Sequence, residues 1–153
     1  MLPVKSYSVS IYILKPDEQG TQVLLLRRTG HLDGLWCQVA GGIEQGEKAW
    51  QTAVREVHEE TGISLSELWS ADVLEQFYAK DKECIALVPV FVSTVQGNTK
   101  VVLNDEHDAF KWVSFEEAAE LLSFTGQKKI LAAVKAEFVD KEPNPNLKIS
   151  LDG

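Results

Sequence analysis

The chain has 153 residues, 25% of them charged, and a formal net charge of −8 at pH 7. This length suits one domain with a substantial hydrophobic core. The excess of negative charge argues against a surface that tracks the phosphates of a nucleic-acid polymer.

The sequence disfavours two further classes of protein. The two cysteines, Cys37 and Cys84, give neither a disulfide framework nor the spacing of a zinc site. No apolar run approaches the length of a membrane span, and the N-terminus lacks the basic-then-apolar layout of a signal peptide. We therefore expect reduced thiols, no membrane association and a cytoplasmic location.

The first part of the chain predicts strands that lead into a glycine loop. Residues 7–14 and 22–28 are rich in β-forming side chains and flank the turn residues 16–20, a pattern typical of a hairpin. Residues 36–40 are expected to form another short strand, which delivers the chain to the loop at residues 41–47.

The next segment, residues 48–61, contains neither glycine nor proline and predicts a helix. Gly62 follows, and glycine suits the left-handed position just past a helix end. One face of this helix is apolar and is expected to pack on the core; it carries Trp50, Ala53, Val54, Val57 and Thr61. A second face, about 100° wide, carries Glu56, Glu59 and Glu60.

Three carboxylates near the C-terminal end of a helix repel one another and the negative end of the helix dipole. A hard divalent cation would remove this repulsion, because Mg²⁺ and Mn²⁺ take oxygen ligands and bridge to phosphate oxygens. The alternative is that the glutamates are solvated surface charges, as most helix glutamates are.

The remaining residues predict more strands and two helices. Strands are expected at residues 68–79, 83–95, 100–103 and 110–113, with a turn at 96–98. Ser114 opens a Ser-x-x-Glu capping box for a helix that ends at Leu122, and a second helix is expected at residues 126–139. We expect residues 1–140 to form a single α/β domain, a mixed sheet between helices, and residues 141–153 an irregular C-terminal tail.

Nine positions across the loop and the helix share one spacing pattern. A glycine is followed after five residues by a glutamate, and after seven more by Arg-Glu-aliphatic-x-Glu-Glu-x-Gly-aliphatic. The residues are Gly41, Glu47, Arg55, Glu56, Val57, Glu59, Glu60, Gly62 and Ile63. The pattern resembles the Nudix box of the Nudix hydrolase family, with no position missing, and this completeness favours a cation site over solvated charges. The resemblance implies the α/β/α sandwich of the Nudix fold and Mg²⁺- or Mn²⁺-dependent hydrolysis of a small-molecule phosphoanhydride.

The resemblance also implies metal ligands. Glu59 and Glu60 would be the principal ligands, and Glu56 a further ligand or the base that activates water. The backbone carbonyl of Ala40, just before the first glycine of the motif, would be another ligand.

Other residues of the motif would support this site. The resemblance implies that Glu47 and Arg55 pin the loop to the helix and that Gly41 and Gly62 are structural. Arg55 lies four residues before Glu59, a spacing that lets it orient a catalytic carboxylate.

Outside the motif, Glu106 is the strongest catalytic candidate. The resemblance places a carboxylate in this loop as an extra metal ligand or a base, and the alternative is an exposed loop carboxylate. His107 is a candidate proton-transfer group or phosphate contact, because histidine titrates near physiological pH. Its alternative role is structural, bonding the loop backbone.

Three candidates for substrate binding lie on predicted strands. Arg27 and Arg28 are neighbours on one strand and point to opposite faces, so at most one of them faces the phosphates. Tyr78 lies in roughly the region where diadenosine tetraphosphate hydrolases place an aromatic side chain for base stacking. Trp36 could also stack on a ring, but a core anchor is the favoured interpretation.

The segments 36–42 and 105–112 bear on the choice of substrate. Many Nudix relatives have Pro-Gly-Gly where this chain has Val-Ala-Gly at 39–41. Together the two segments resemble the branch that contains dihydroneopterin triphosphate pyrophosphatase, also called dATP pyrophosphohydrolase. We therefore expect a nucleoside or pterin triphosphate to be cut to a monophosphate and pyrophosphate.

Two other functions stay open as alternatives. Residues 106–112 read Glu-His-x-Ala-aromatic-basic-Trp, which also resembles the asymmetric diadenosine tetraphosphate hydrolases. A nucleotide sensor without catalysis is disfavoured, because silent relatives usually lose glutamates of the motif and this chain keeps all of them. The oligomeric state is open, with a homodimer as one alternative.

Overall fold

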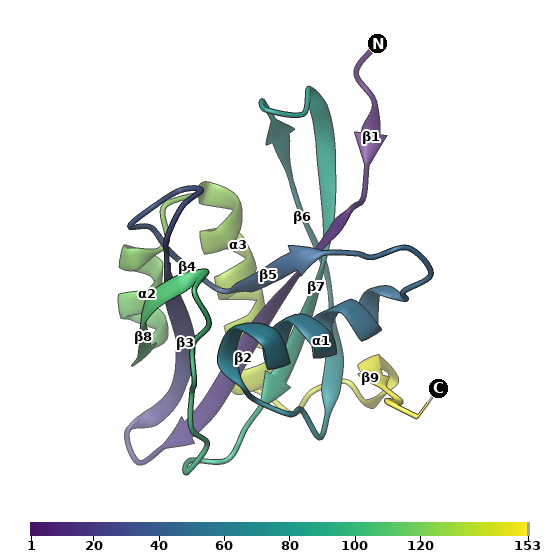
Figure 1. Cartoon of the computed structure of the whole chain (residues 1–153). Helices are drawn as coiled ribbons and strands as arrows, with labels where there is room; N and C mark the ends of the chain where they lie inside the picture. Colours follow the sequence, from purple (N-terminus) through teal and green to yellow (C-terminus); the bar gives the residue numbers. More distant parts are fainter. Residues whose placement is uncertain (153) are drawn as a thin grey trace.

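The computed structural model describes residues 1–152, and over these residues the strands form one nine-stranded mixed sheet with helices on both faces (Figure 1). The strands are β1 Val4–Lys5, β2 Ser8–Asp17, β3 Gly20–Arg28, β4 Trp36–Cys37, β5 Val39–Gly42, β6 Leu68–Ala79, β7 Cys84–Thr94, β8 His107–Val113 and β9 Lys148–Ile149. The helices are α1 Ala49–Thr61, α2 Phe115–Leu121 and α3 Thr125–Val134, with a π-helix, η1, at Lys135–Val139 and a 3-10 turn, η2, at Pro145–Leu147. The expected mixed sheet between helices is confirmed.

Strand β2 lies at the centre of the sheet and is buried on both faces. It pairs in parallel with β7 and antiparallel with β3, and its first half also pairs antiparallel with β5. Val9, Ile11 and Ile13 pack in the core cluster on the α1 face, whereas Tyr12 and Leu14 pack in the cluster on the α2–α3 face. A strand covered on both faces needs no polar alternation, which accounts for the apolar run in this part of the sequence.

This topology brings the glycine loop into the centre of the molecule. In the β2–β5 ladder, Val9 is paired with Gly41 and Ser10 with Ala40. Helix α1 follows the loop and packs on β5 and β2 through its apolar stripe (Figure 1). The nine-position motif therefore begins on a core ladder, contains most of a core helix and ends two residues past it.

The ends of the helices follow local sequence signals. Gly62 ends α1 with φ 73°, and its N–H donates to the carbonyl of His58 (2.9 Å). Ser114 begins α2 by accepting the N–H of Glu117 at its hydroxyl (3.1 Å). None of the described helices is both long and apolar enough to span a membrane.

Two expected boundaries in the first half are wrong. The hairpin has no five-residue turn, because β2 and β3 continue to a paired Asp17 and Gly20 and leave two residues between them. The strand expected at 36–40 is interrupted at Gln38. Its two parts, β4 and β5, pair with different strands, β3 and β2, so the chain must step from one neighbour to the next.

The strand expected at 100–103 is also wrong. This segment is an irregular connection, and the N–H of Val102 donates to the carbonyl of Thr61 (2.8 Å) in the last residue of α1. The bond satisfies one of the carbonyls that a helix end leaves without an internal partner. The segment therefore serves the helix end and not the sheet.

The C-terminal segment differs from the expectation as well. The helix expected at 126–139 is α-helical to Val134 and then continues as η1. The expected irregular tail contains η2 and β9, and β9 pairs with β6 at Leu68 and Trp69. Phe138 packs edge-on against Trp69, with ring centroids 6.2 Å apart. A polar tail has no period of its own, and this one becomes ordered because β6 offers an unpaired edge.

Candidate functional site

The site begins where β5 meets α1. The side chain of Glu56 lies directly against Gly41, so that a Cβ at residue 41 would stand 2.1 Å from Cδ of Glu56 and 2.4 Å from its Oε1. Gly41 does not have a positive φ. The first glycine of the motif is therefore required by its contact with Glu56 and not by its backbone conformation.

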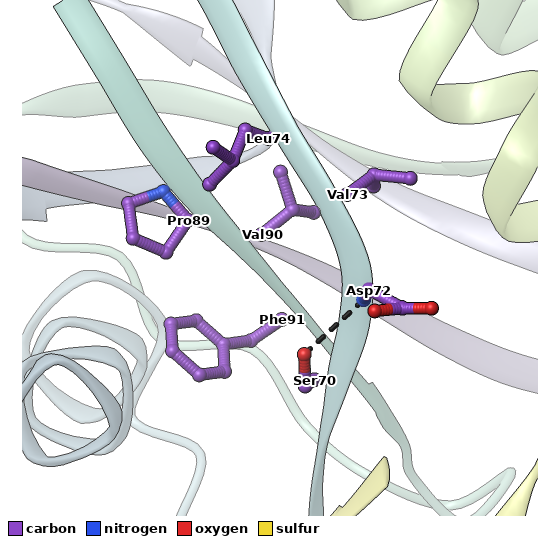
Figure 2. Close-up of a pocket in the computed structure, with 7 residues that line it drawn as sticks. All are labelled: Ser70, Asp72, Val73, Leu74, Pro89, Val90 and Phe91. Carbon is purple, nitrogen blue, oxygen red and sulfur yellow. Dashed lines mark hydrogen bonds between the residues drawn. The ribbon is translucent and has the colours of Figure 1, made fainter.

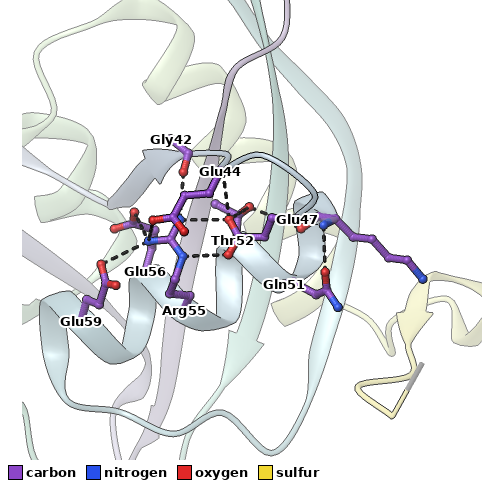
Figure 3. A network of polar contacts seen from close by, with 9 residues as sticks. Gly42, Glu44, Glu47, Gln51, Thr52, Arg55, Glu56 and Glu59 are labelled. Carbon is purple, nitrogen blue, oxygen red and sulfur yellow. Dashed lines mark hydrogen bonds and ion pairs between the residues drawn. The ribbon is translucent and has the colours of Figure 1, made fainter.

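Arg55 is the centre of the polar contacts that join the loop to the helix (Figure 3). Its Nε donates to Oε2 of Glu47 (2.8 Å), and its Nη2 donates to Oε1 of Glu47 (3.0 Å) and to the carbonyl of Gly42 (3.0 Å). Its Nη1 donates to Oε1 of Glu56 (2.9 Å). The hydroxyl of Thr52 donates to Oε1 of Glu47 (2.6 Å). Glu56 is thus held from two directions, by the glycine and by the arginine.

The electrostatics of this pair keep both partners charged. Hydrogen bonds from Arg55, and then from Thr52, lower the pKa of Glu47 to about 2. The hydrogen bond to Glu47 is also the largest cause that raises the pKa of Arg55. A two-point guanidinium–carboxylate contact is directional as well as charged, so it fixes the loop geometrically.

The three glutamates of α1 lie in different environments. The side chains of Glu56 and Glu60 are 11% and 2% exposed, whereas that of Glu59 is 51% exposed. Glu59 accepts a hydrogen bond from Nη1 of Arg55 (3.2 Å). The expectation that the three carboxylates share one face is too simple. Glu56 and Glu60 are four residues apart and lie above one another on the helix, whereas Glu59 is rotated toward solvent.

Glu60 is the buried carboxyl of the site. Burial, and then the hydrogen bond and charge of Glu56, raise its pKa. None of the described residues forms a hydrogen bond with its Oε2. A buried carboxyl without a donor or a cation is costly, and a bound cation would remove that cost.

Glu106 and His107 join Glu60 from the start of β8. One ligand atom of each of these three residues lies within 4.8 Å of the others. We refer to Glu60, Glu106 and His107 as the acidic cluster. Nδ1 of His107 is 3.6 Å from Oε1 of Glu60 and has no hydrogen-bond partner among the described residues. Glu106 is exposed, and its N–H donates to Oδ1 of Asn104 (3.1 Å). Two candidates that lie far from the motif in sequence therefore meet its most buried glutamate.

Burial and a neighbouring charge disfavour the protonated form of His107. Burial, and then the charge of Arg28, lower its pKa. Burial favours the uncharged form of both His107 and Glu60, which disfavours an ion pair between them. Its Nε2 lies 3.9 Å from Sγ of Cys37, and burial raises the pKa of that thiol to about 11.

Arg27 and Arg28 have different surroundings. Nε of Arg27 donates to Oδ1 of Asp108 (2.7 Å), in an ion pair whose side chains are 43% and 47% exposed. The charge of Arg28 instead lowers the pKa of His107 and opposes the rise in the pKa of Glu60. Nε of Arg28 donates to the carbonyl of His31 (3.0 Å), and of the two arginines Arg28 is the one whose charge acts on both Glu60 and His107.

The structure does not bring every candidate to this cluster. Tyr78 is exposed near the end of β6, and its hydroxyl donates to the carboxylate of Glu83 in the adjoining turn. Trp36 is half-buried, with Nζ of Lys111 5.0 Å from the centroid of its ring. Ala40 lies on β5 next to Gly41, the residue that contacts Glu56.

The β6–β7 pair carries a hollow (Figure 2). It is lined by Ser70, Asp72, Val73, Leu74, Pro89, Val90 and Phe91. Here the register of β6 against β7 shifts, and Asp72 has φ 60°. None of the predicted site residues lines this hollow.

The donor set of the acidic cluster suits a divalent cation. The carboxylates of Glu60 and Glu106 are the oxygen ligands that Mg²⁺ and Mn²⁺ prefer, and the imidazole of His107 is a ligand for transition metals. Two atoms of this set, Oε2 of Glu60 and Nδ1 of His107, have no partner among the described residues. The residues present therefore fit a cation.

The sequence-based prediction missed two neighbours of the site. Thr52 bonds Glu47, and its place five residues later, in the first turn of a helix entered from that loop, is a signal that could have found it. Cys37 reaches His107 only because β3 pairs with both β4 and β8. No local pattern in the sequence reports that contact.

Comparisons with known proteins agree with this geometry. Residues 5–134 match the NUDIX domain family. The chain is 31% identical over 126 residues to the asymmetrical bis(5′-nucleosyl)-tetraphosphatase of Mus musculus, covering 78% of this chain and 82% of that protein. It is 34% identical over 136 residues to the octanoyltransferase of Myxococcus xanthus, covering 88% of this chain but only 38% of the length of that relative.

A solved structure shows the same architecture. The dihydroneopterin triphosphate pyrophosphohydrolase of E. coli superposes with a TM-score of 0.70 at 24% identity, over 86% of this chain and 95% of that chain. The family match extends over every element from β2 to α3 and includes the whole nine-position motif. The chain therefore belongs to the NUDIX family.

Proposed function

We propose that this NUDIX hydrolase cleaves a phosphoanhydride bond of a nucleoside or pterin triphosphate to give a monophosphate and pyrophosphate. The observation that carries the proposal is the buried Glu60, which meets Glu106 and His107 and has a carboxylate oxygen without a partner among the described residues. A buried carboxyl oxygen without a partner is costly for packing, and a bound cation would remove this cost.

We propose Mg²⁺ or Mn²⁺ as the cofactor, held by Glu56 and Glu60, with Glu59 and the carbonyl of Ala40 as further candidate ligands. When bound, such a cation supplies positive charge that neutralises phosphate oxygens and lowers the pKa of coordinated water. The chain has only three arginines. Guanidinium groups, the side chains suited to two-point phosphate contacts, are thus scarce in this chain, which favours a metal as the main partner of a triphosphate.

The residues of the chain divide the work of positioning and proton transfer. Arg55 and Gly41 hold Glu56 in one place, which spares the site the reorganisation that a mobile carboxylate would need. Glu106 is exposed, so a water molecule can reach it, and we assign it as the base that accepts the proton of the attacking water. Arg28 is proposed to bind a phosphate oxygen beside the cluster.

The choice between substrates rests on two different similarities. The segments 36–42 and 105–112 resemble those of the dihydroneopterin triphosphate and dATP enzymes, which favours a triphosphate. The mouse relative is named for a dinucleoside tetraphosphate, and its identity of 31% supports a dinucleoside polyphosphate about equally well. Tyr78 stays a candidate for base stacking in that second case.

One screen tests the proposal. Purified protein is incubated with nucleoside triphosphates, dihydroneopterin triphosphate and dinucleoside polyphosphates in Mg²⁺ or Mn²⁺, and the products are identified by mass. Pyrophosphate released from a triphosphate is the expected result. Preferential cleavage of a dinucleoside polyphosphate would favour the alternative, whereas nucleotide binding without any cleavage would establish a sensor and overturn the proposal.

Labelled water and two variants then assign the chemistry. Reaction in ¹⁸O-water shows which phosphorus is attacked, because the label enters only the product that water forms. Glu56→Gln is expected to lower turnover by orders of magnitude while the fold is kept. Glu106→Gln is expected to lower kcat and to remove the acid limb of its pH profile, and an unchanged limb would contradict its role as the base.

A further inference from the structure

A chain of buried side-chain amides links α3 to the start of β5. Gln127, in the first turn of α3, accepts the N–H of Phe124 at Oε1 (3.2 Å) and donates from Nε2 to Oε1 of Gln38 (3.0 Å). Gln38 in turn donates from Nε2 to Oγ of Ser10 (2.8 Å). Gln127, Gln38 and Ser10 are only 6%, 5% and 1% exposed. We refer to these three residues as the amide relay.

The amide relay ends beside the strand that carries the first part of the motif. Gln38 immediately precedes β5, and Ser10 is paired with Ala40 in the β2–β5 ladder. The next residue, Gly41, is in contact with Glu56, and no space remains between them. A displacement of β5 by a few tenths of an ångström is therefore passed directly to the Glu56 side chain.

Stability alone does not account for these buried amides. The face of the sheet that they cross is otherwise an apolar core cluster. Replacing both partners of a buried hydrogen bond by apolar groups of similar shape is often neutral or stabilising. A head-to-tail chain of hydrogen bonds does what apolar packing cannot, because it fixes the position and direction of the groups that it joins.

We propose that Gln38 and Gln127 are positioning residues for the hydrolysis. The amide relay sets the position of β5 against Glu56, so that α3 controls the geometry of an acidic site from the opposite face of the sheet. The inference rests on the proposed function, since Glu56 matters for catalysis only if the acidic cluster is the reaction site. The relay acts through Gly41 and Glu56 and needs no contact of its own with the substrate.

The test uses Gln38→Met, Gln127→Met and the double variant, because methionine is apolar, unbranched and of similar length. Each single variant is expected to lower kcat roughly tenfold with KM nearly unchanged, since a misplaced catalytic group costs rate more than binding. Binding of Mn²⁺ to the substrate-free protein, followed by electron paramagnetic resonance of the free ion, is expected to weaken roughly threefold. The double variant should be no worse than the poorer single one, because both changes break one chain of bonds.

Ser114→Ala is the matched control. It removes the cap of α2, on the same side of the sheet, and is expected to lower Tm without changing kcat or Mn²⁺ affinity. If circular dichroism shows that the methionine variants do not fold, Ser10→Ala replaces them in the test. It removes only the last acceptor of the amide relay, so kcat and Mn²⁺ affinity should fall, but by less than is expected for the methionine variants.

The outcomes separate the relay from the proposed function. Folded methionine variants with wild-type kcat and Mn²⁺ affinity, or with only the loss of Tm seen in Ser114→Ala, would overturn the relay. Additive losses in the double variant would also overturn it. If no compound of the screen is cleaved, the proposed function fails, but Mn²⁺ binding without substrate still tests the relay.

Discussion

The carboxyl carbon of Glu56 occupies the space where Gly41 would carry a side chain. A Cβ at residue 41 would stand 2.1 Å from that carbon, although the backbone there does not have a positive φ. Sequence conventions treat this glycine as part of a loop. The contact shows that it is a packing partner of a catalytic candidate.

Gly41→Ala is expected to displace Glu56 and to lower kcat roughly 100-fold, because a misplacement of about 1 Å can cost that much. Overpacking should also lower the free energy of unfolding by about 1–3 kcal/mol. Steady-state rates and urea unfolding measure the two effects. Gly97→Ala is the control, since a Cβ at that position meets no atom within 4 Å. An active Gly41→Ala enzyme would show that Glu56 does not need its present place.

Without metal, Glu60→Gln is expected to be more stable than the wild type, and this difference should grow as pH rises. The folded-state pKa of Glu60 lies above the ordinary value of 4.5, so its folded carboxyl binds a proton that the unfolded chain releases. Wild-type stability is therefore lost as pH rises from 4.5 toward the raised pKa, and the glutamine variant escapes this loss. In EDTA at pH 8, urea unfolding should give the variant a free energy of unfolding that is higher than that of the wild type by on the order of 1–3 kcal/mol.

The same variant should lose its response to metal. Mn²⁺ is expected to raise the Tm of the wild type more at pH 8 than at pH 5, because the cation binds the ionised carboxylate. For Glu60→Gln the rise should be small at both values of pH. Equal stabilisation of both proteins by Mn²⁺ would place the ion elsewhere.

Arg55→Lys tests whether the shape of the guanidinium matters beyond its charge. Lysine keeps the charge but cannot make the two-point contact with Glu47 while also bonding Glu56 and Gly42. We expect kcat to fall roughly tenfold or more, with some loss of thermal stability. Lys135→Arg, at an exposed ion pair with Asp140, is a control that should change neither. Full activity in Arg55→Lys would reduce its role to simple charge balance.

Arg28 and Arg27 should differ in their effect on substrate binding. The charge of Arg28 acts on both Glu60 and His107, whereas Arg27 is engaged in an exposed ion pair with Asp108. Losing a hydrogen bond to a charged group costs about 1.5–3 kcal/mol, so Arg28→Gln should raise KM for the substrate roughly tenfold or more. Arg27→Gln should have the smaller effect in the same steady-state assay. The reverse order would assign the phosphates to the other face of β3.

Elements with a strong local signal were predictable from the sequence. The helix at 48–61 is recognisable from its apolar stripe and from Gly62, and α2 from the cap at Ser114, because these signals act within one or two turns. The short strand β9 was not predictable. It exists only because the edge of β6 accepts it, and such pairing leaves no periodicity in the tail.

The sequence singled out candidate residues for the site but could not give their arrangement. The spacing of the motif identified Glu56, Glu59 and Glu60, yet only the packing of α1 on the sheet separates the buried Glu60 from the exposed Glu59. The relay of Gln38 and Gln127 was missed altogether, since a bond between side chains 89 positions apart has no signature in either neighbourhood.

The contiguity of the nine-position motif hides how widely its support is distributed. A peptide of residues 41–63 would carry every position of the motif, but it would lack Val9, which pairs with Gly41, and the groups at 106–107 that meet Glu60. The motif therefore depends on residues outside it for its structure. Grafting residues 41–63 onto another scaffold would transfer the nine residues of the motif but not the surrounding residues that bury the carboxyl of Glu60.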